Sequence, residues 1–109
     1  MATAQRELRA AQNQLLFRSV NDRIKELGQR ALSPVAELGF ACECDRPECH
    51  EPITMTLEEF AAIERSGKNR FVVRAGHEDD DVEDVIERKE RYAIVAKRGA
   101  GAEFIRQNA

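Results

Sequence analysis

Apolar side chains recur at helical spacing along the first thirty residues. Intervals of three and four residues separate Phe17, Val20, Ile24, Leu27 and Ala31, and Leu8, Ala11, Leu15 and Leu16 extend the stripe toward the N-terminus. This period predicts one long amphipathic helix over residues 4–30. The spacing suits packing against the helix's own domain, but it equally suits a seam with a second copy or another protein.

After this helix the pattern changes to short runs typical of strands. Pro34 ends the helix, because proline disfavours helical geometry in the residue before it. Residues 35–41 predict a strand that leads into a cysteine-rich loop, and residues 53–55 predict its return. Thr56 and Glu59 match a capping box, which predicts a short helix that begins after Thr56. Ser66-Gly67 ends that helix.

The remaining apolar runs predict three more strand segments and a tail. Residues 70–74 are rich in β-branched and aromatic side chains, as strands are. Residues 85–88 and 92–97 predict a hairpin that turns near Lys89-Glu90. Gly99-Ala100-Gly101 predicts a break before a loose tail, in which Phe104-Ile105 is the one pair suited to docking.

These elements predict an α+β fold with three parts. A long N-terminal helix occupies residues 1–31, and a metal-stabilised α+β domain with a small antiparallel sheet and one short helix occupies residues 32–98. A flexible tail occupies residues 99–109. With 109 residues, of which 25 are Leu, Ile, Val or Phe, the core is small. Domains of this size often depend on a disulfide or a metal for stability.

The chemistry of the chain is concentrated in one loop. All three cysteines, Cys42, Cys44 and Cys49, fall within eight residues. Three cysteines cannot all pair as disulfides, which favours a reducing compartment. No secretory signal is visible and no apolar run has the length of a membrane span, so we expect a cytoplasmic protein.

Thiolates this close together predict a metal site, with zinc as the expected ion. Cys42 and Cys44 are two residues apart, so on a strand they point to one face. The two histidines, His50 and His77, are candidates for a fourth ligand. We favour His77, because neighbouring side chains such as those of Cys49 and His50 diverge in extended backbone. A carboxylate or a water molecule remains an alternative.

A Cys₃His set is closed, which predicts one structural ion rather than a catalytic one. We therefore expect a non-enzymatic zinc protein, a regulatory or protein-interaction module whose N-terminal helix contacts a partner or a second copy. A zinc-thiolate redox sensor is the alternative, and a metal-dependent enzyme ranks below both. Nucleic-acid binding is disfavoured, since residues 32–109 carry eleven basic and seventeen acidic side chains.

Four sequence segments occur one after another along this chain. They are residues 16–24, the Cys42-Glu43-Cys44 to Cys49 loop, residues 57–60 (Leu-Glu-Glu-Phe) and Gly76-His77-Glu78. Together they resemble a group of small, uncharacterised actinobacterial proteins over roughly residues 14–98. The resemblance implies a metal site formed by Cys42, Cys44, Cys49 and His77, and it implies no activity. Those proteins tend to carry glycine where this chain has Lys89-Glu90-Arg91.

Overall fold

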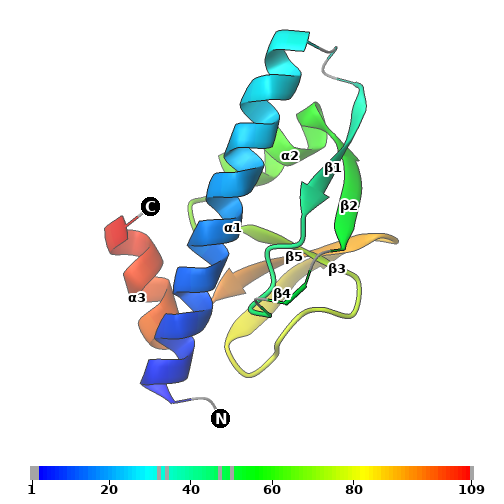
Figure 1. Ribbon diagram of the computed structural model, residues 1–109. Helices are drawn as coiled ribbons and strands as arrows, with labels where there is room; N and C mark the ends of the chain where they lie inside the picture. The colour runs from blue at the N-terminus through cyan, green and yellow to red at the C-terminus, as the bar shows by residue number, and fades with distance from the viewer. Residues whose placement is uncertain (1–2, 32, 34, 47, 50, 109) are drawn as a thin grey trace.

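The structure, a computed structural model, has the α+β fold that the sequence predicts (Figure 1). It describes residues 3–31, 33, 35–46, 48, 49 and 51–108. Two small antiparallel sheets lie beside one long helix and two shorter ones. In chain order the elements are α1 (Ala4–Ala31), β1 (Glu37–Ala41), β2 (Pro52–Thr56), α2 (Leu57–Arg65), β3 (Phe71–Arg74), β4 (Glu83–Arg88), β5 (Tyr92–Lys97) and α3 (Gly99–Asn108).

Helix α1 packs mainly against α3, β1 and α2 (Figure 1). Its buried face consists of small and polar residues, namely Ala10, Ala11, Gln14, Asn21 and Gly28. Of the large apolar residues of the predicted stripe, Leu16, Val20 and Leu27 are exposed, whereas Leu15 and Ile24 are partly buried against the core. No described helix combines the length and apolar character needed to cross a membrane.

Strands β1 and β2 form a two-stranded antiparallel ribbon that is covered on one face. Phe40, Ile53 and Met55 point into the core, where the rings of Phe40 and Phe60 stack with centroids 4.6 Å apart. Helix α2 follows β2 directly. The capping box is confirmed, because Thr56 Oγ1 accepts from the Glu59 amide and the Glu59 carboxylate accepts from the Thr56 amide, each at 3.0 Å.

The second sheet has three strands in the order β3-β5-β4. All six residues of the central strand β5 are buried, so this strand lies entirely in the interior. The sequence predicts a single sheet, whereas the structure has two. They meet where the amide of Glu43, just after β1, donates to the carbonyl of Val72 in β3 at 2.8 Å.

The prediction of a flexible tail after residue 98 is wrong, because residues 99–108 form helix α3. This helix packs along the N-terminal half of α1 and buries Ile105 (Figure 1). The glycines of this segment suggest a break in the sequence pattern, but in the structure they start the helix and let it approach α1 closely. Gly99 has the positive φ of 57° that starts the helix, and a Cβ on Gly101 would lie 2.9 Å from the backbone oxygen of Glu7.

Candidate metal centre

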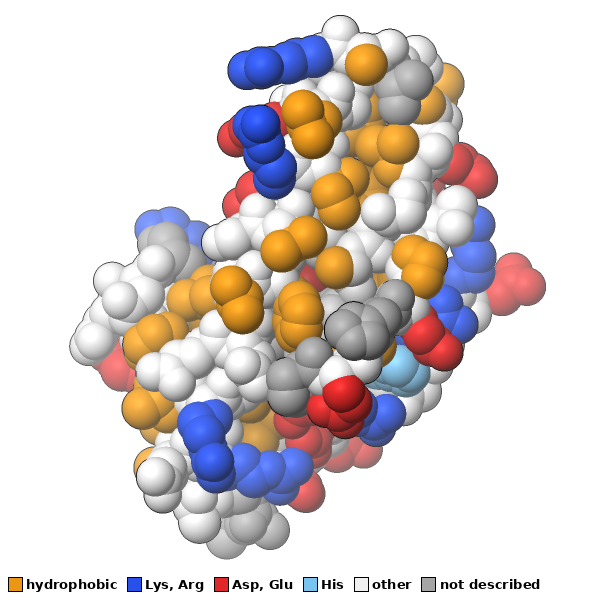
Figure 2. All heavy atoms as spheres, in the orientation of Figure 1, with side chains coloured by type: hydrophobic (Ala, Val, Ile, Leu, Met, Phe, Trp, Pro, Cys, Tyr) orange, Lys and Arg blue, Asp and Glu red, His pale blue; other side chains and the backbone are white. Residues whose placement is uncertain are grey.

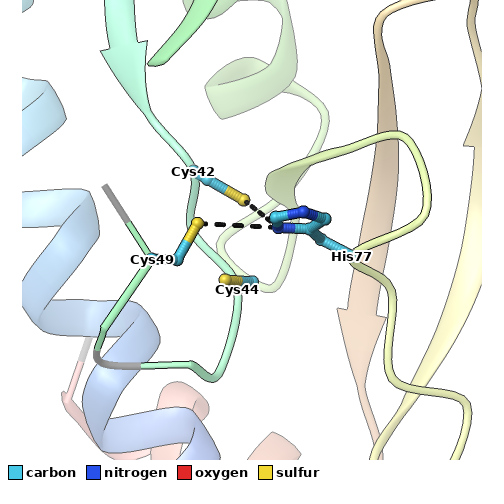
Figure 3. Close-up of side chains that lie close together, drawn as sticks. All are labelled: Cys42, Cys44, Cys49 and His77. Atoms are coloured by element: carbon cyan, nitrogen blue, oxygen red, sulfur yellow. Dashed lines mark hydrogen bonds between the residues drawn. The ribbon is translucent and has the colours of Figure 1, made fainter. Parts of the chain in front are cut away.

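The structure brings Cys42, Cys44, Cys49 and His77 together. One ligand atom from each of these residues lies within 4.8 Å of all the others. The Nδ1 atom of His77 is 3.6 Å from Cys42 Sγ and 3.5 Å from Cys49 Sγ (Figure 3). These are the four residues predicted from the sequence. The alternative ligand, His50, lies outside the described residues.

The three cysteines are positioned by the end of β1 and the loop that follows it. Cys42 comes directly after Ala41, the last residue of β1. Its sulfur accepts a hydrogen bond of 3.2 Å from the amide of Arg74, which holds it against the end of β3. Cys49 returns to the cluster through a turn in which its amide donates to the carbonyl of Arg46 at 3.0 Å.

His77 reaches the cysteines from a different segment, just after β3. Its amide donates to the carbonyl of Arg74 at 2.9 Å, and Gly76 makes the turn with a φ of 91°. While Nδ1 faces the sulfurs, Nε2 lies 3.6 Å from the carboxylate of Glu51. Arg74 holds that carboxylate in turn at 2.8 Å. At 3.6 Å this carboxylate is near the ring but beyond hydrogen-bond distance.

Glu43, between the first two cysteines, is a site residue that the sequence reasoning missed. Its side chain is fully buried, and its carboxylate accepts from Arg18 Nε at 2.7 Å and from the Val72 amide at 2.8 Å. Arg18 Nη2 adds a second bond of 2.9 Å, so the guanidinium binds the carboxylate in bidentate fashion. The signal that could have found this pair was an acidic residue between two ligands.

Asn21 supplies a second link from α1 to the loop. Its side-chain oxygen accepts from the Ala41 amide at 2.7 Å, and its amide group donates to the Ala41 carbonyl at 2.9 Å. The same group also donates to the Glu43 carboxylate at 2.9 Å. Arg18 and Asn21 therefore fix the backbone on both sides of Cys42, and they explain why α1 buries polar rather than apolar residues here.

The electrostatics of the buried sulfurs favour a bound cation. A hydrogen bond from Cys42 lowers the pKa of Cys44 to about 5, although burial opposes this shift. The same bond, together with burial, raises the pKa of Cys42 above its ordinary value. The lowered pKa favours the thiolate form of Cys44, which is the form that binds a metal ion.

The donor set fits zinc well. Zinc–sulfur bonds of about 2.3 Å in a tetrahedron place the sulfurs about 3.7 Å apart, so the observed cluster needs only a small contraction. Cys42, Cys44, Cys49 and His77 could therefore hold one metal ion. Comparisons with family models, curated proteins and solved structures found no match for this chain.

Proposed function

We propose that this protein is a non-enzymatic zinc-binding module that carries one structural ion. The observation that carries the proposal is the Cys₃His cluster itself, whose ligands come from two segments of the chain. Three ligands follow β1, and His77 follows β3. An ion at this point cross-links the two sheets in a domain with a small core.

The donor set supports a structural ion rather than a catalytic one. Catalytic zinc usually keeps an open coordination position for water, whereas four protein ligands close the tetrahedron. Three thiolates also place much negative charge on the ion, which weakens it as a Lewis acid. The buried positions of Cys42 and Cys44 point the same way, since substrate would not reach that side of the ion.

We further propose that the module acts through protein contacts made by the outer face of α1, in a regulatory role in the cytoplasm. The apolar residues Leu16, Val20 and Leu27 on that face support this proposal, because contiguous exposed apolar surface is typical of interaction sites. Free thiolate ligands are also best maintained in a reducing compartment.

Metal analysis of the purified chain tests the zinc proposal. We expect about one zinc per chain, and His77→Ala should lower zinc affinity by about tenfold or more because it removes one ligand. His50→Ala is the matched control and should leave the affinity nearly unchanged. A well-folded chain that binds no metal would refute the proposal, and the reverse order of the two variants would reassign the fourth ligand.

A redox sensor is the second candidate, and the exposure of Cys49 favours it. Cys49 is only half-buried and lines a surface cavity of about 250 Å³ with Glu51 and His77. An oxidant such as a peroxide would reach this sulfur first, and its oxidation would release the ion. Peroxide treatment followed by zinc and thiol counts tests the idea. Retention of zinc and of all three thiols would remove this candidate.

A further inference from the structure

The outer surface of α1 carries a band of apolar side chains. Leu16, Val20 and Leu27 are 62%, 45% and 50% exposed. Figure 2 shows that apolar side chains run diagonally across this face of the molecule, with Lys and Arg side chains gathered toward both ends. A band of this kind marks a surface that another molecule covers.

A groove of about 300 Å³ runs beside this band, between α1 and the β1–β2 ribbon. Its α1 wall consists of large side chains, Phe17, Val20 and Ile24. Its ribbon wall is formed by the small residues Gly39 and Ala41 and by Pro52, together with the buried Phe40. One wall therefore projects and the other is flat, and the flat wall is the uncovered face of a two-stranded ribbon, a structure that is marginal without a covering layer.

The two sides of the groove also differ in charge. The outer face of α1 bears the exposed arginines Arg9, Arg23 and Arg30, of which Arg23 contacts Glu26 of the same helix at 3.3 Å. The ribbon side bears the exposed Glu37 at the start of β1 and, in the cysteine loop, the exposed Glu48 beside the exposed Arg46. These charged side chains flank the groove rather than line it, with basic ones on its α1 side and acidic ones on its ribbon side, so two copies of the chain can pair opposite charges at its rim.

We propose that the occupant of this groove is a second copy of the chain, bound about a twofold axis. A twofold axis sets the α1 wall of each copy against the ribbon wall of the other copy. The apolar side chains of each α1 then pack on the flat ribbon face of the partner. Because β1 starts beside the C-terminal end of α1 (Figure 1), antiparallel α1 helices bring Arg9 of one copy toward the partner's Glu37. An acidic helix from another protein would complement only the basic side.

The metal centre forms one end of this groove, which links the two sites. Cys42 and Cys49 line it together with the apolar side chains. The inference therefore rests on the proposed zinc function, because an ion that orders the cysteine loop also completes the groove. Zinc removal should weaken the dimer even though no ligand side chain need cross the interface.

Sedimentation velocity of the zinc-loaded full chain tests the proposal. We expect a species of about twice the 12.3 kDa chain mass. Leu16→Glu and Val20→Glu should each give a monomer that retains one zinc, because both side chains are exposed within one chain. Ile86→Glu is the matched control. Ile86 is 50% exposed but lies on β4, away from the groove, so this variant should remain a dimer.

A charge exchange tests the twofold arrangement. Glu37→Arg and Arg9→Glu should each weaken the dimer by about tenfold, since symmetry repeats every lost pair, and the double variant should recover most of the loss. A zinc-loaded monomer at about 100 µM would overturn the dimer alone and indicate a different occupant. Failure of the double variant to recover would overturn the twofold arrangement. A folded chain without zinc would instead overturn the proposed zinc function.

Discussion

The two sheets of this protein are stabilised by different interactions. In the β3-β5-β4 sheet, all six residues of the central strand β5 are buried, so apolar packing accounts for the stability of this sheet. The β1–β2 ribbon has only two strands, and such ribbons are marginal by themselves. It is at the ribbon that three of the four predicted metal ligands lie. The comparison indicates that an ion held by this cluster would reinforce the two-stranded part of the fold.

Removal of the metal should produce the largest difference in stability between the two sheets. We expect a chelator to abolish amide-exchange protection in β1, β2 and the cysteine loop while β5 keeps most of its protection. Structural zinc in small domains contributes on the order of 10 kcal/mol, so the effect on the ribbon should be large. Hydrogen exchange measured by mass spectrometry reports both regions in one experiment. An equal loss of protection in both sheets would break the comparison.

A buried acidic residue lies in the cysteine loop after β1 and another lies in β4, which allows a matched pair of variants. Glu43→Gln removes the bidentate charge partner of Arg18, whose side chain is only 11% exposed, and leaves only the Glu64 carboxylate at 3.9 Å. We expect a loss of about 3 kcal/mol in unfolding free energy, together with weaker zinc binding, because Glu43 lies between two ligands. Urea denaturation and competition with a chelator dye measure the two effects.

The control for this variant is Glu83→Gln in β4. Glu83 is 2.8 Å from Lys97 Nζ in β5, and both side chains are buried. Its loss should lower stability by a similar amount, about 3 kcal/mol, and leave zinc affinity unchanged. Equal effects of the two variants on zinc affinity would show that the metal centre is not specific to the ribbon.

The parts of the fold that the sequence predicts are those in which neighbouring residues determine the structure. The capping box at Thr56 is local, and so is the cysteine loop. His77 could be predicted because the chain has only two histidines and one of them adjoins Cys49. In each case the sequence left few alternative structures or ligands.

The parts that the sequence did not predict depend on contacts between distant segments. The role of Glu43 requires Arg18, which is 25 residues away. Helix α3 packs on α1 because Gly101 lets it approach Glu7 closely, whereas the spacing of the glycines alone predicts a loop. The division into two sheets likewise depends on where β3 pairs, namely with β5 rather than with β2.

Gly101→Ala should disturb the core-packed half without affecting the metal. The added Cβ would lie 2.9 Å from the Glu7 carbonyl oxygen, so α3 must move away from α1. We expect a loss of about 2 kcal/mol in unfolding free energy, as for other overpacked sites. Zinc content should stay at the wild-type level. Zinc loss in this variant would contradict the assignment of α3 to the half that packs independently of the metal.

The smallest expected effect concerns the contact of α1 with α2. Burial, followed by a hydrogen bond with Glu64, raises the pKa of Asp22 to about 7, although Arg18 and Lys25 oppose the shift. A raised carboxyl pKa favours folding below the unfolded value of 3.8, and this contribution is lost as the pH rises through about 7. Asp22→Asn mimics the protonated acid and removes this dependence.

The advantage of Asp22→Asn over the wild type should therefore grow by about 1 kcal/mol between about pH 5.5 and about pH 8, after allowance for solvent screening. Urea denaturation of both zinc-loaded proteins at the two pH values measures it, and the difference between them cancels the titration of the metal ligands. A constant difference would mean that Asp22 is ionised throughout this range. An increase that persists after zinc removal would instead assign the α1–α2 junction to the half of the molecule that folds without the metal.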